Sequence, residues 1–123
     1  MIYIASPYSG THDEKVDRFV QVQAFCHHLF YNRGLFVYSP IVHWHPIAVK
    51  WDEYGNFEKY EQFDYHMLDL ATDMYILCLD GWQESKGVNL EISFCHSQRK
   101  NVLAYDKASF DFSASITHAR KAW

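Results

Sequence analysis

Hydrophobic positions recur along this chain with two spacings, which predict alternating strands and helices. Residues 1–6 (MIYIAS) form a short apolar run that is typical of a strand, and Pro7 ends it. From residue 13 to 33, apolar side chains fall three or four positions apart, as on one face of an amphipathic helix, and Gly34 follows as a C-cap. Residues 35–39 (LFVYS) predict a second strand before Pro40. Because the connections are short, we expect a βαβ unit with parallel strands.

The second half of the chain continues this alternation after an irregular stretch. Residues 41–54 contain VHWHP and WDEYGN, and we expect a loop there with at most one short helical turn. The apolar spacing then predicts a helix over residues 57–72, a strand over 74–79, a helix over 86–99 and a strand over 101–105. We expect an irregular segment over residues 106–112 and a short terminal helix over 113–123.

This order of elements predicts an α/β fold in a single domain, residues 1–123. We expect a three-layer α/β/α sandwich around a parallel, flavodoxin-like or Rossmann-like sheet with the strand order 2-1-3-4. The strand order reverses between the first strand and the strand at Met74. Ligands of such sheets bind at the carboxyl ends of the strands, where the order reverses. The loops after Ser6 and Leu79 are therefore the expected walls of the site.

Composition and charge exclude several classes of function. The chain has 123 residues, 49% of them hydrophobic and 18% aromatic, which is enough to bury one core without disulfides or metals. The net charge is −4 and lysines and arginines are scattered, whereas a protein that binds polymeric nucleic acid needs a basic stripe. No apolar stretch approaches the length of a membrane span. We expect a soluble, cytosolic protein without membrane contact, in which Cys26, Cys78 and Cys95 are reduced core thiols.

The segment from Asp80 to Glu91 carries the most specific chemical signal. It follows a buried strand and leads into a helix, so its loop lies at the carboxyl edge of the sheet. Ser85 and Gly87 offer a hydroxyl and a close backbone approach near a helix N-terminus, which suits a phosphate or another anion. Ser85 also serves the helix as a plain N-cap. Glu91, one turn further, is either a partner of the helix dipole or a catalytic group.

Taken together, several motifs resemble a known superfamily. These are the strand IYIASPYS, a strand ending in SP, a polar helix carrying Asp64 and the run LDGWQESKGVNLEISFC, in which Gly81-Trp82, Ser85-x-Gly87-Val and Glu91 stand in order. Over residues 1–105 the chain resembles the nucleoside 2-deoxyribosyltransferase superfamily. It looks most like the small bacterial and phage proteins of uncharacterised function beside that superfamily, and it is also similar to the 2′-deoxynucleoside 5′-phosphate N-hydrolases.

The resemblance implies roles for individual residues. Glu91 matches the glutamate that attacks the anomeric carbon of a deoxyribose and displaces the base. Asp64 matches an aspartate implicated in proton transfer, and Tyr3 matches a tyrosine that orients the nucleophile. At the position of Ser85 the transferases carry an acidic residue and the hydrolases a serine, which favours a 5′-monophosphate. Asn89 stands where related enzymes often have a glycine.

Loop residues complete the set of expected substrate contacts. The set comprises Ser6, Tyr8, Ser9, His43, His45, Gly81, Trp82, Ser85 and Gly87. The serines and glycines are also ordinary turn residues. In an extended segment, His43 and His45 point the same way and could share a metal ion with Asp52, Glu53 or His66, but loop histidines more often line a pocket or bond the backbone.

Three functional hypotheses follow. The first is an enzyme that cleaves the N-glycosidic bond of 2′-deoxynucleosides or their 5′-monophosphates, by hydrolysis or deoxyribosyl transfer, using Glu91 and Asp64 as its two carboxyl groups. The second is a non-catalytic module that binds or sequesters a nucleotide in the same cleft. The third is a metal-dependent hydrolase using His43 and His45. For the first hypothesis we expect no cofactor, and the resemblance implies a homodimer or larger homo-oligomer.

Overall fold

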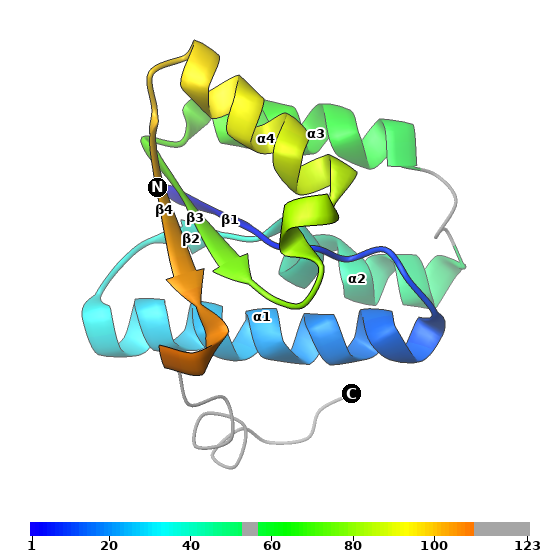
Figure 1. Ribbon diagram of the computed structural model, residues 1–123. Coiled ribbons are helices and arrows are strands. Elements are labelled where there is room, and N and C mark those ends of the chain that lie inside the picture. Colours follow the sequence, from blue (N-terminus) through cyan, green and yellow to red (C-terminus); the bar gives the residue numbers. More distant parts are fainter. Residues whose placement is uncertain (53–56, 110–123) are drawn as a thin grey trace.

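The computed structural model describes residues 1–52 and 57–109, which alternate between strands and helices (Figure 1). The elements are β1 (Ile2–Ala5), α1 (His12–Arg33), β2 (Val37–Tyr38), α2 (Pro40–Trp51), α3 (Phe57–Leu70), β3 (Asp73–Cys78), α4 (Lys86–Ser97) and β4 (Asn101–Asp106). Short 3-10 helices follow β3 and β4, at Trp82–Glu84 and Lys107–Ser109. The expected terminal helix over 113–123 lies outside the described residues.

The four described strands form one sheet in the order β2-β1-β3-β4, and every neighbouring pair is parallel. The register places Ile2 of β1 beside Val37 of β2 and beside Asp73 of β3. The predicted strand order and the α/β class are therefore confirmed. The carboxyl ends of β1 and β3 lie side by side, since Ala5 pairs with Ile76.

Helices cover both faces of the sheet, as in a three-layer sandwich (Figure 1). The side chains of Ile2 and Ile4 pack with those of α1 and α2, while Tyr3 and Ala5 point to the other face and pack with α3 and α4. This alternation follows from the two-residue repeat of a strand. Burial on both faces explains why β1 and β3 read as unbroken apolar runs.

Local signals in the sequence account for the ends of α1. The Thr11 side chain accepts a hydrogen bond from the backbone of Glu14, whose carboxylate bonds back to Thr11, so the two residues form a capping box. At the other end, Gly34 adopts φ 65°, in the left-handed region that disfavours residues with a Cβ atom. The observed helix begins one residue before the predicted position.

Helix α2 corrects our expectation of a loop after residue 40. The prediction was wrong because Pro46 and the turn-like composition suggested a break, whereas Pro46 lies within a helix of 12 residues. Ser39 caps this helix by accepting a hydrogen bond from the Val42 amide at 3.2 Å, and Pro40 occupies its first turn. Buried residues Ile41 and Ala48 hold it against the rest of the fold. Tertiary packing thus outweighs the hydrogen bond that Pro46 removes.

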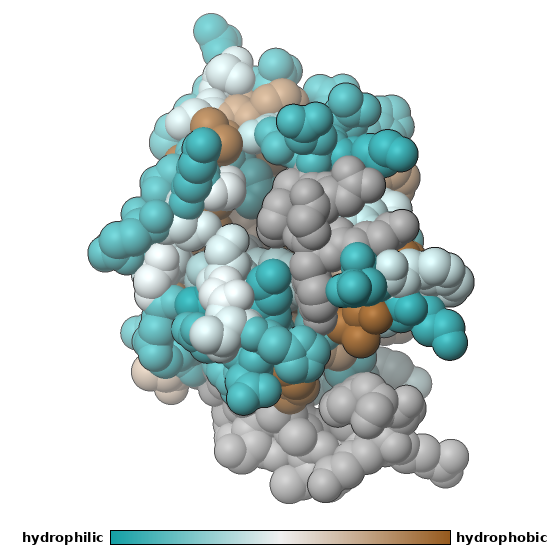
Figure 2. Space-filling model, turned by 90° about the vertical axis from the view of Figure 1, so that its right-hand side faces the viewer, coloured by the Kyte–Doolittle hydropathy of each residue, from teal (hydrophilic) through white to brown (hydrophobic). Residues whose placement is uncertain are grey.

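The surface, the helices and the cysteines of the described residues bear on the expectations from composition. The face shown in Figure 2 is mostly hydrophilic, and its hydrophobic residues gather in small separate groups. Among residues 1–52 and 57–109, none of the helices combines the length and apolar character that crossing a bilayer requires. Cys26, Cys78 and Cys95 are free thiols, as expected, and Cys95 is fully buried.

Candidate active site

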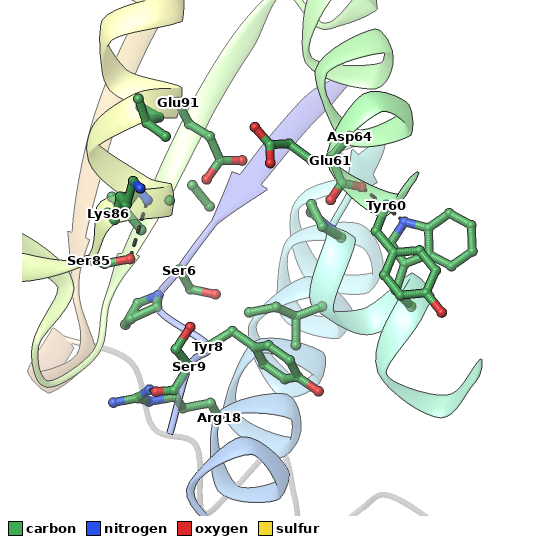
Figure 3. Close-up of a pocket in the computed structure, with 18 of the residues that line it drawn as sticks. Ser6, Tyr8, Ser9, Arg18, Tyr60, Glu61, Asp64, Ser85, Lys86 and Glu91 are labelled. Atoms are coloured by element: carbon green, nitrogen blue, oxygen red, sulfur yellow. Dashed lines mark hydrogen bonds between the residues drawn. The ribbon is translucent and has the colours of Figure 1, made fainter. Parts of the chain in front are cut away.

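A pocket of about 750 Å³ opens at the carboxyl ends of β1 and β3, which is the edge that the strand order predicted. Its walls come from the loop after β1 and from α1, α2, α3 and the start of α4. Figure 3 shows Glu91 on α4 and the acidic side chains of α3 directed toward this space, with the loop after β1 running below them. The predicted site residues that line it are Tyr3, Ser6, Tyr8, Ser9, His45, Asp64, Gly81, Ser85, Gly87 and Glu91.

Glu91 lies on the second turn of α4 with its carboxyl group withdrawn from water. Burial raises its pKa to about 8, and the negative charge of Asp64 acts in the same direction. The hydroxyl of Tyr3, on β1, is a hydrogen-bond partner that partly offsets this rise, because it stabilises the ionised carboxylate. Glu91 also raises the pKa of Tyr3, whose ring is almost fully buried. A proton on Glu91 is therefore held more tightly than on an ordinary glutamate.

Asp64 projects from α3 into the opposite wall. Its Oδ1 accepts hydrogen bonds from the Trp44 indole at 3.0 Å and from the Tyr38 hydroxyl at 3.2 Å. Burial raises the pKa of Asp64 to about 6, although both donors favour the ionised form and lower it. The pKa of Asp64 therefore reflects burial, partly offset by two aromatic donors that come from β2 and α2.

Glu91 and Asp64 titrate as neighbours, because the charge of Asp64 helps to raise the pKa of Glu91. With pKa values of about 8 and about 6, the pair carries one proton over most of the range between these values. The larger rise is that of Glu91, so this carboxyl group holds the proton more tightly than Asp64 does. A one-proton carboxyl pair can supply both a nucleophile and an acid, provided that the proton moves to the partner group.

Glu61 adds another carboxyl group to the same wall. It lies one turn before Asp64 on α3, lines the pocket, and its charge raises the pKa of both Asp64 and Glu91. Our reading of the sequence missed it. The spacing of three residues from Asp64 was the available signal, since residues three apart share one face of a helix.

The loop after β1 contributes polar groups to the floor. The hydroxyl oxygen of Ser6 is buried and has no hydrogen-bond partner among the described residues. Such a group is uncommon in folded proteins and is readily satisfied by a ligand. Ser9 is held by its backbone oxygen, which accepts a hydrogen bond from Arg18 of α1.

Tyr8 and His45 form a hydrogen-bonded pair, with 2.5 Å between the Tyr8 hydroxyl and His45 Nδ1. His45 is buried and stacks on Phe19 with ring centroids 4.5 Å apart. Burial lowers the pKa of His45, and the positive charges of His12 and Lys15 add to this. An imidazole that carries its hydrogen on Nε2 accepts a hydrogen bond from the Tyr8 hydroxyl at Nδ1.

The start of α4 forms a cationic end of the pocket. The hydroxyl of Ser85 accepts a hydrogen bond from the Val88 amide at 3.3 Å, so its structural role as an N-cap is present. A Cβ atom added to Gly87 would meet nothing within 4 Å, which leaves open space beside the helix N-terminus. Arg18 and Lys86 also line the pocket. Backbone amides, a helix dipole and two cations together favour an anion here.

Two of the expected substrate contacts lie elsewhere. His43 stacks on Phe63 with an angle of 9° between the rings, on a different side of α2 from His45, and it does not line the pocket. Trp82 packs against the core beneath α4. Because α2 is a helix, two residues that are two positions apart do not point the same way. In residues 1–52 and 57–109, no group of three or more His, Cys, Asp or Glu side chains is placed to hold a metal ion.

Aromatic residues from α2 and α3 complete the walls near Asp64. They are Trp44, Tyr60 and Tyr65, none of which our sequence reasoning assigned to the site. Trp44 and Tyr60 lie with ring centroids 4.7 Å apart. The place of Trp44 depends on α2 being a helix, which the composition of the segment concealed. An aromatic wall suits a flat ring such as a nucleobase.

Comparison with known proteins identifies the family. Residues 1–107 match the family described as Domain of unknown function (DUF1937), and the chain belongs to it. The match covers all the strands that the structure describes and every residue of the pocket. Comparison with curated proteins returned no match.

Proposed function

We propose that this member of the DUF1937 family cleaves the N-glycosidic bond of 2′-deoxynucleosides or their 5′-monophosphates. One observation carries the proposal: Glu91 and Asp64, from two helices, line one pocket at the switch point of the sheet, and each is held by an aromatic hydroxyl or indole group. The resemblance to the nucleoside 2-deoxyribosyltransferase superfamily supports the same two residues. Breaking this bond requires one group to meet the positive charge at the anomeric carbon and another to protonate the base.

The reaction balances with these two carboxyl groups. Ionised Glu91 forms a bond to the anomeric carbon, the carbon–nitrogen bond breaks, and its electron pair stays on the base nitrogen. Asp64 gives its proton to the base, which leaves neutral. Water then attacks the anomeric carbon of the glycosyl ester, Asp64 takes the proton from that water, and Glu91 is released as a carboxylate. A second base in place of water gives deoxyribosyl transfer.

The reacting arrangement requires the pair's proton to sit on Asp64. Burial raises the pKa of Glu91 to about 8 and that of Asp64 to about 6, so Glu91 holds this proton more tightly than Asp64 does. Positive charge that develops on the sugar favours ionised Glu91 and so moves the proton in the required direction.

The cationic end of the pocket supports a 5′-monophosphate as the preferred substrate. The N-terminus of α4 lines the pocket at Lys86 and Gly87, and Arg18 and Lys86 bring positive charge to a lining that also holds Glu84. Ser85 stands where the phosphate-using hydrolases also have a serine. The buried Ser6 hydroxyl, which lacks a partner, supports a contact to a sugar or phosphate oxygen between the two ends.

The decisive experiment is incubation of the purified protein with each 2′-deoxynucleoside and each 5′-monophosphate, followed by chromatography for free base. We expect base release with at least one monophosphate, and its loss in Glu91→Gln. Glu58→Gln is the matched control, because Glu58 is exposed on α3 and does not line the pocket. The absence of release with every substrate at high enzyme concentration contradicts the proposal.

A second function, nucleotide binding without turnover, is favoured by one observation. Burial raises the pKa of Glu91 to about 8, which favours its protonated form at neutral pH, and a protonated carboxyl group is no nucleophile. For this function, calorimetry shows a bound monophosphate, wild type releases no base, and Glu91→Ala retains its affinity. The homo-oligomer implied by the resemblance stays a prediction, which light scattering on the purified chain tests.

A further inference from the structure

Both hydrogen bonds to Asp64 end on the same oxygen. The Trp44 indole donates to Oδ1 at 3.0 Å and the Tyr38 hydroxyl donates to Oδ1 at 3.2 Å. Neither of these two bonds reaches Oδ2. The carboxyl group is therefore held unsymmetrically, through Oδ1, in a residue that lines the pocket.

We propose that Tyr38 and Trp44 are positioning residues that turn Asp64 so that its proton resides on Oδ2, facing the bond to be broken. This inference rests on the proposed function, because it assigns the direction of the proton transfer in that reaction. Neither residue was expected at the site from the sequence, and neither touches the anomeric carbon in this role. They act through the carboxyl group that they hold.

The donor chemistry determines which oxygen carries the proton. An indole nitrogen donates and never accepts, so Trp44 requires a lone pair on Oδ1 in every protonation state of Asp64. Two donors on Oδ1 favour the oxygen with the greater negative charge, which in a neutral carboxyl group is the carbonyl oxygen. The hydrogen of neutral Asp64 is consequently placed on Oδ2.

Ring contacts keep both donors in place. Trp44 lies between Tyr60 and Phe63, with ring centroids 4.7 and 5.3 Å away. Tyr38 contacts the ring of Tyr3 at 5.9 Å, and Tyr3 is the hydrogen-bond partner of Glu91. The acid and the nucleophile are thus held by neighbouring tyrosines on adjacent strands, β2 and β1. Packing of this kind limits the rotamers of a positioning side chain.

A titration of the wild-type protein tests the contact without any substitution. The Trp44 indole signal in a ¹⁵N–¹H spectrum is expected to shift with pH along the same curve as the Asp64 side-chain carbon, and to lose this dependence in Asp64→Asn. A Trp44 indole signal that stays constant while Asp64 titrates overturns the proposal. Asp64→Asn also assigns the Asp64 carbon signal.

Substitutions then measure what each donor does. Trp44→Phe and Tyr38→Phe keep an aromatic ring and remove one donor to the ionised carboxylate. Each is expected to raise the midpoint of the Asp64 titration by about one pH unit, since a hydrogen bond to a charged group is worth roughly that much. Trp51→Phe is the matched control on the same helix, because Trp51 is 65% exposed and outside the pocket. An unchanged or lowered midpoint in both variants overturns the proposal.

Kinetics separate positioning from simple structural support. With the proposed reaction, both variants lower kcat about tenfold while KM changes less than threefold, and the acidic limb of the pH profile moves up with the Asp64 midpoint. A fall confined to KM contradicts the assigned role. The spectroscopic titration needs no turnover. If the wild-type protein releases no base but the Asp64 midpoint shifts in the variants, the proposed function is wrong and the positioning role stands. If the variants keep normal activity and their Asp64 midpoints do not shift, the positioning role is wrong and the proposed function stands.

Discussion

The two ends of the pocket are built in different ways. At the acidic end, Glu91 and Asp64 are withdrawn from water and held by hydrogen bonds from aromatic side chains on regular elements. At the cationic end, Ser9 and Lys86 are exposed, and the contacts come from a loop and from a helix N-terminus. Buried and bonded groups have perturbed pKa values, whereas exposed ones supply charge that salt and water screen. We infer that chemistry belongs to the first end and recognition to the second.

Removal of the acid is expected to have the largest effect on this contrast. Asp64→Asn cannot deliver a proton to the departing base, so kcat for base release should fall by about 10²–10⁴. Steady-state assays with a deoxynucleoside monophosphate measure the loss. Asp69→Asn, an exposed change on the same helix, is the control and should retain full activity. Equal activity of Asp64→Asn and wild type would contradict the assignment of the chemistry to the acidic end of the pocket.

Glu91, the proposed nucleophile, should also lower the free energy of unfolding above neutral pH. In the unfolded chain Glu91 ionises near the ordinary glutamate pKa of 4.5, but burial in the folded protein raises its pKa to about 8. Between these values the native state binds more protons than the unfolded state, so stability falls as pH rises through this window. Glu91→Gln removes the cost of ionising this buried group and should raise the free energy of unfolding by about 2 kcal/mol at pH 8.5. This value is smaller than the full pKa shift implies, because water in the open pocket screens the charge.

Denaturant unfolding of both proteins at several pH values measures this difference. Below pH 4.5 the gain should vanish, because Glu91 is then protonated in both states. The control Glu58→Gln changes an exposed carboxyl group and should show no such pH dependence. A constant gain across the whole range points to packing and not to the charge of Glu91.

The pH profile of base release is expected to be bell-shaped. The active form holds one proton on the Glu91–Asp64 pair, which is the main state between pH values of about 6 and about 8. Activity should therefore fall about tenfold for each pH unit outside this window. Measurement of kcat/KM from pH 4.5 to 9.5 tests the form of the curve. A profile that keeps rising above pH 9 argues against any role for a protonated carboxyl group.

The smallest effect is expected at the cationic end. Lys86→Met removes one exposed charge at the first turn of α4, and an exposed charge contact is worth up to about 1 kcal/mol. The preference for a monophosphate over the free nucleoside should fall about fivefold, with kcat nearly unchanged. Lys59→Met on α3 is the control. A loss of kcat in Lys86→Met would mean that the cationic end contributes to the chemical step and not to binding alone.

The sequence predicted the fold class, the strand order and the place of the pocket. Apolar runs at β1 and β3 and the helical spacing of α1, α3 and α4 predicted the class and strand order, because a sheet buried on both faces constrains composition strongly. The switch-point rule then located the pocket. The capping pattern at Ser85 and the position of Glu91 identified one wall of it.

What the sequence alone determined was this local order and the positions of Glu91 and Asp64 as candidates. The tertiary structure decided the surroundings that give them different properties. Trp44 reaches Asp64 because α2 is a helix despite Pro46, and buried contacts of Ile41 and Ala48 maintain it there. Burial and hydrogen bonds between elements distant in sequence set a carboxyl group's pKa, and neither follows from local spacing. The acidity of the site is therefore a property of the packed fold.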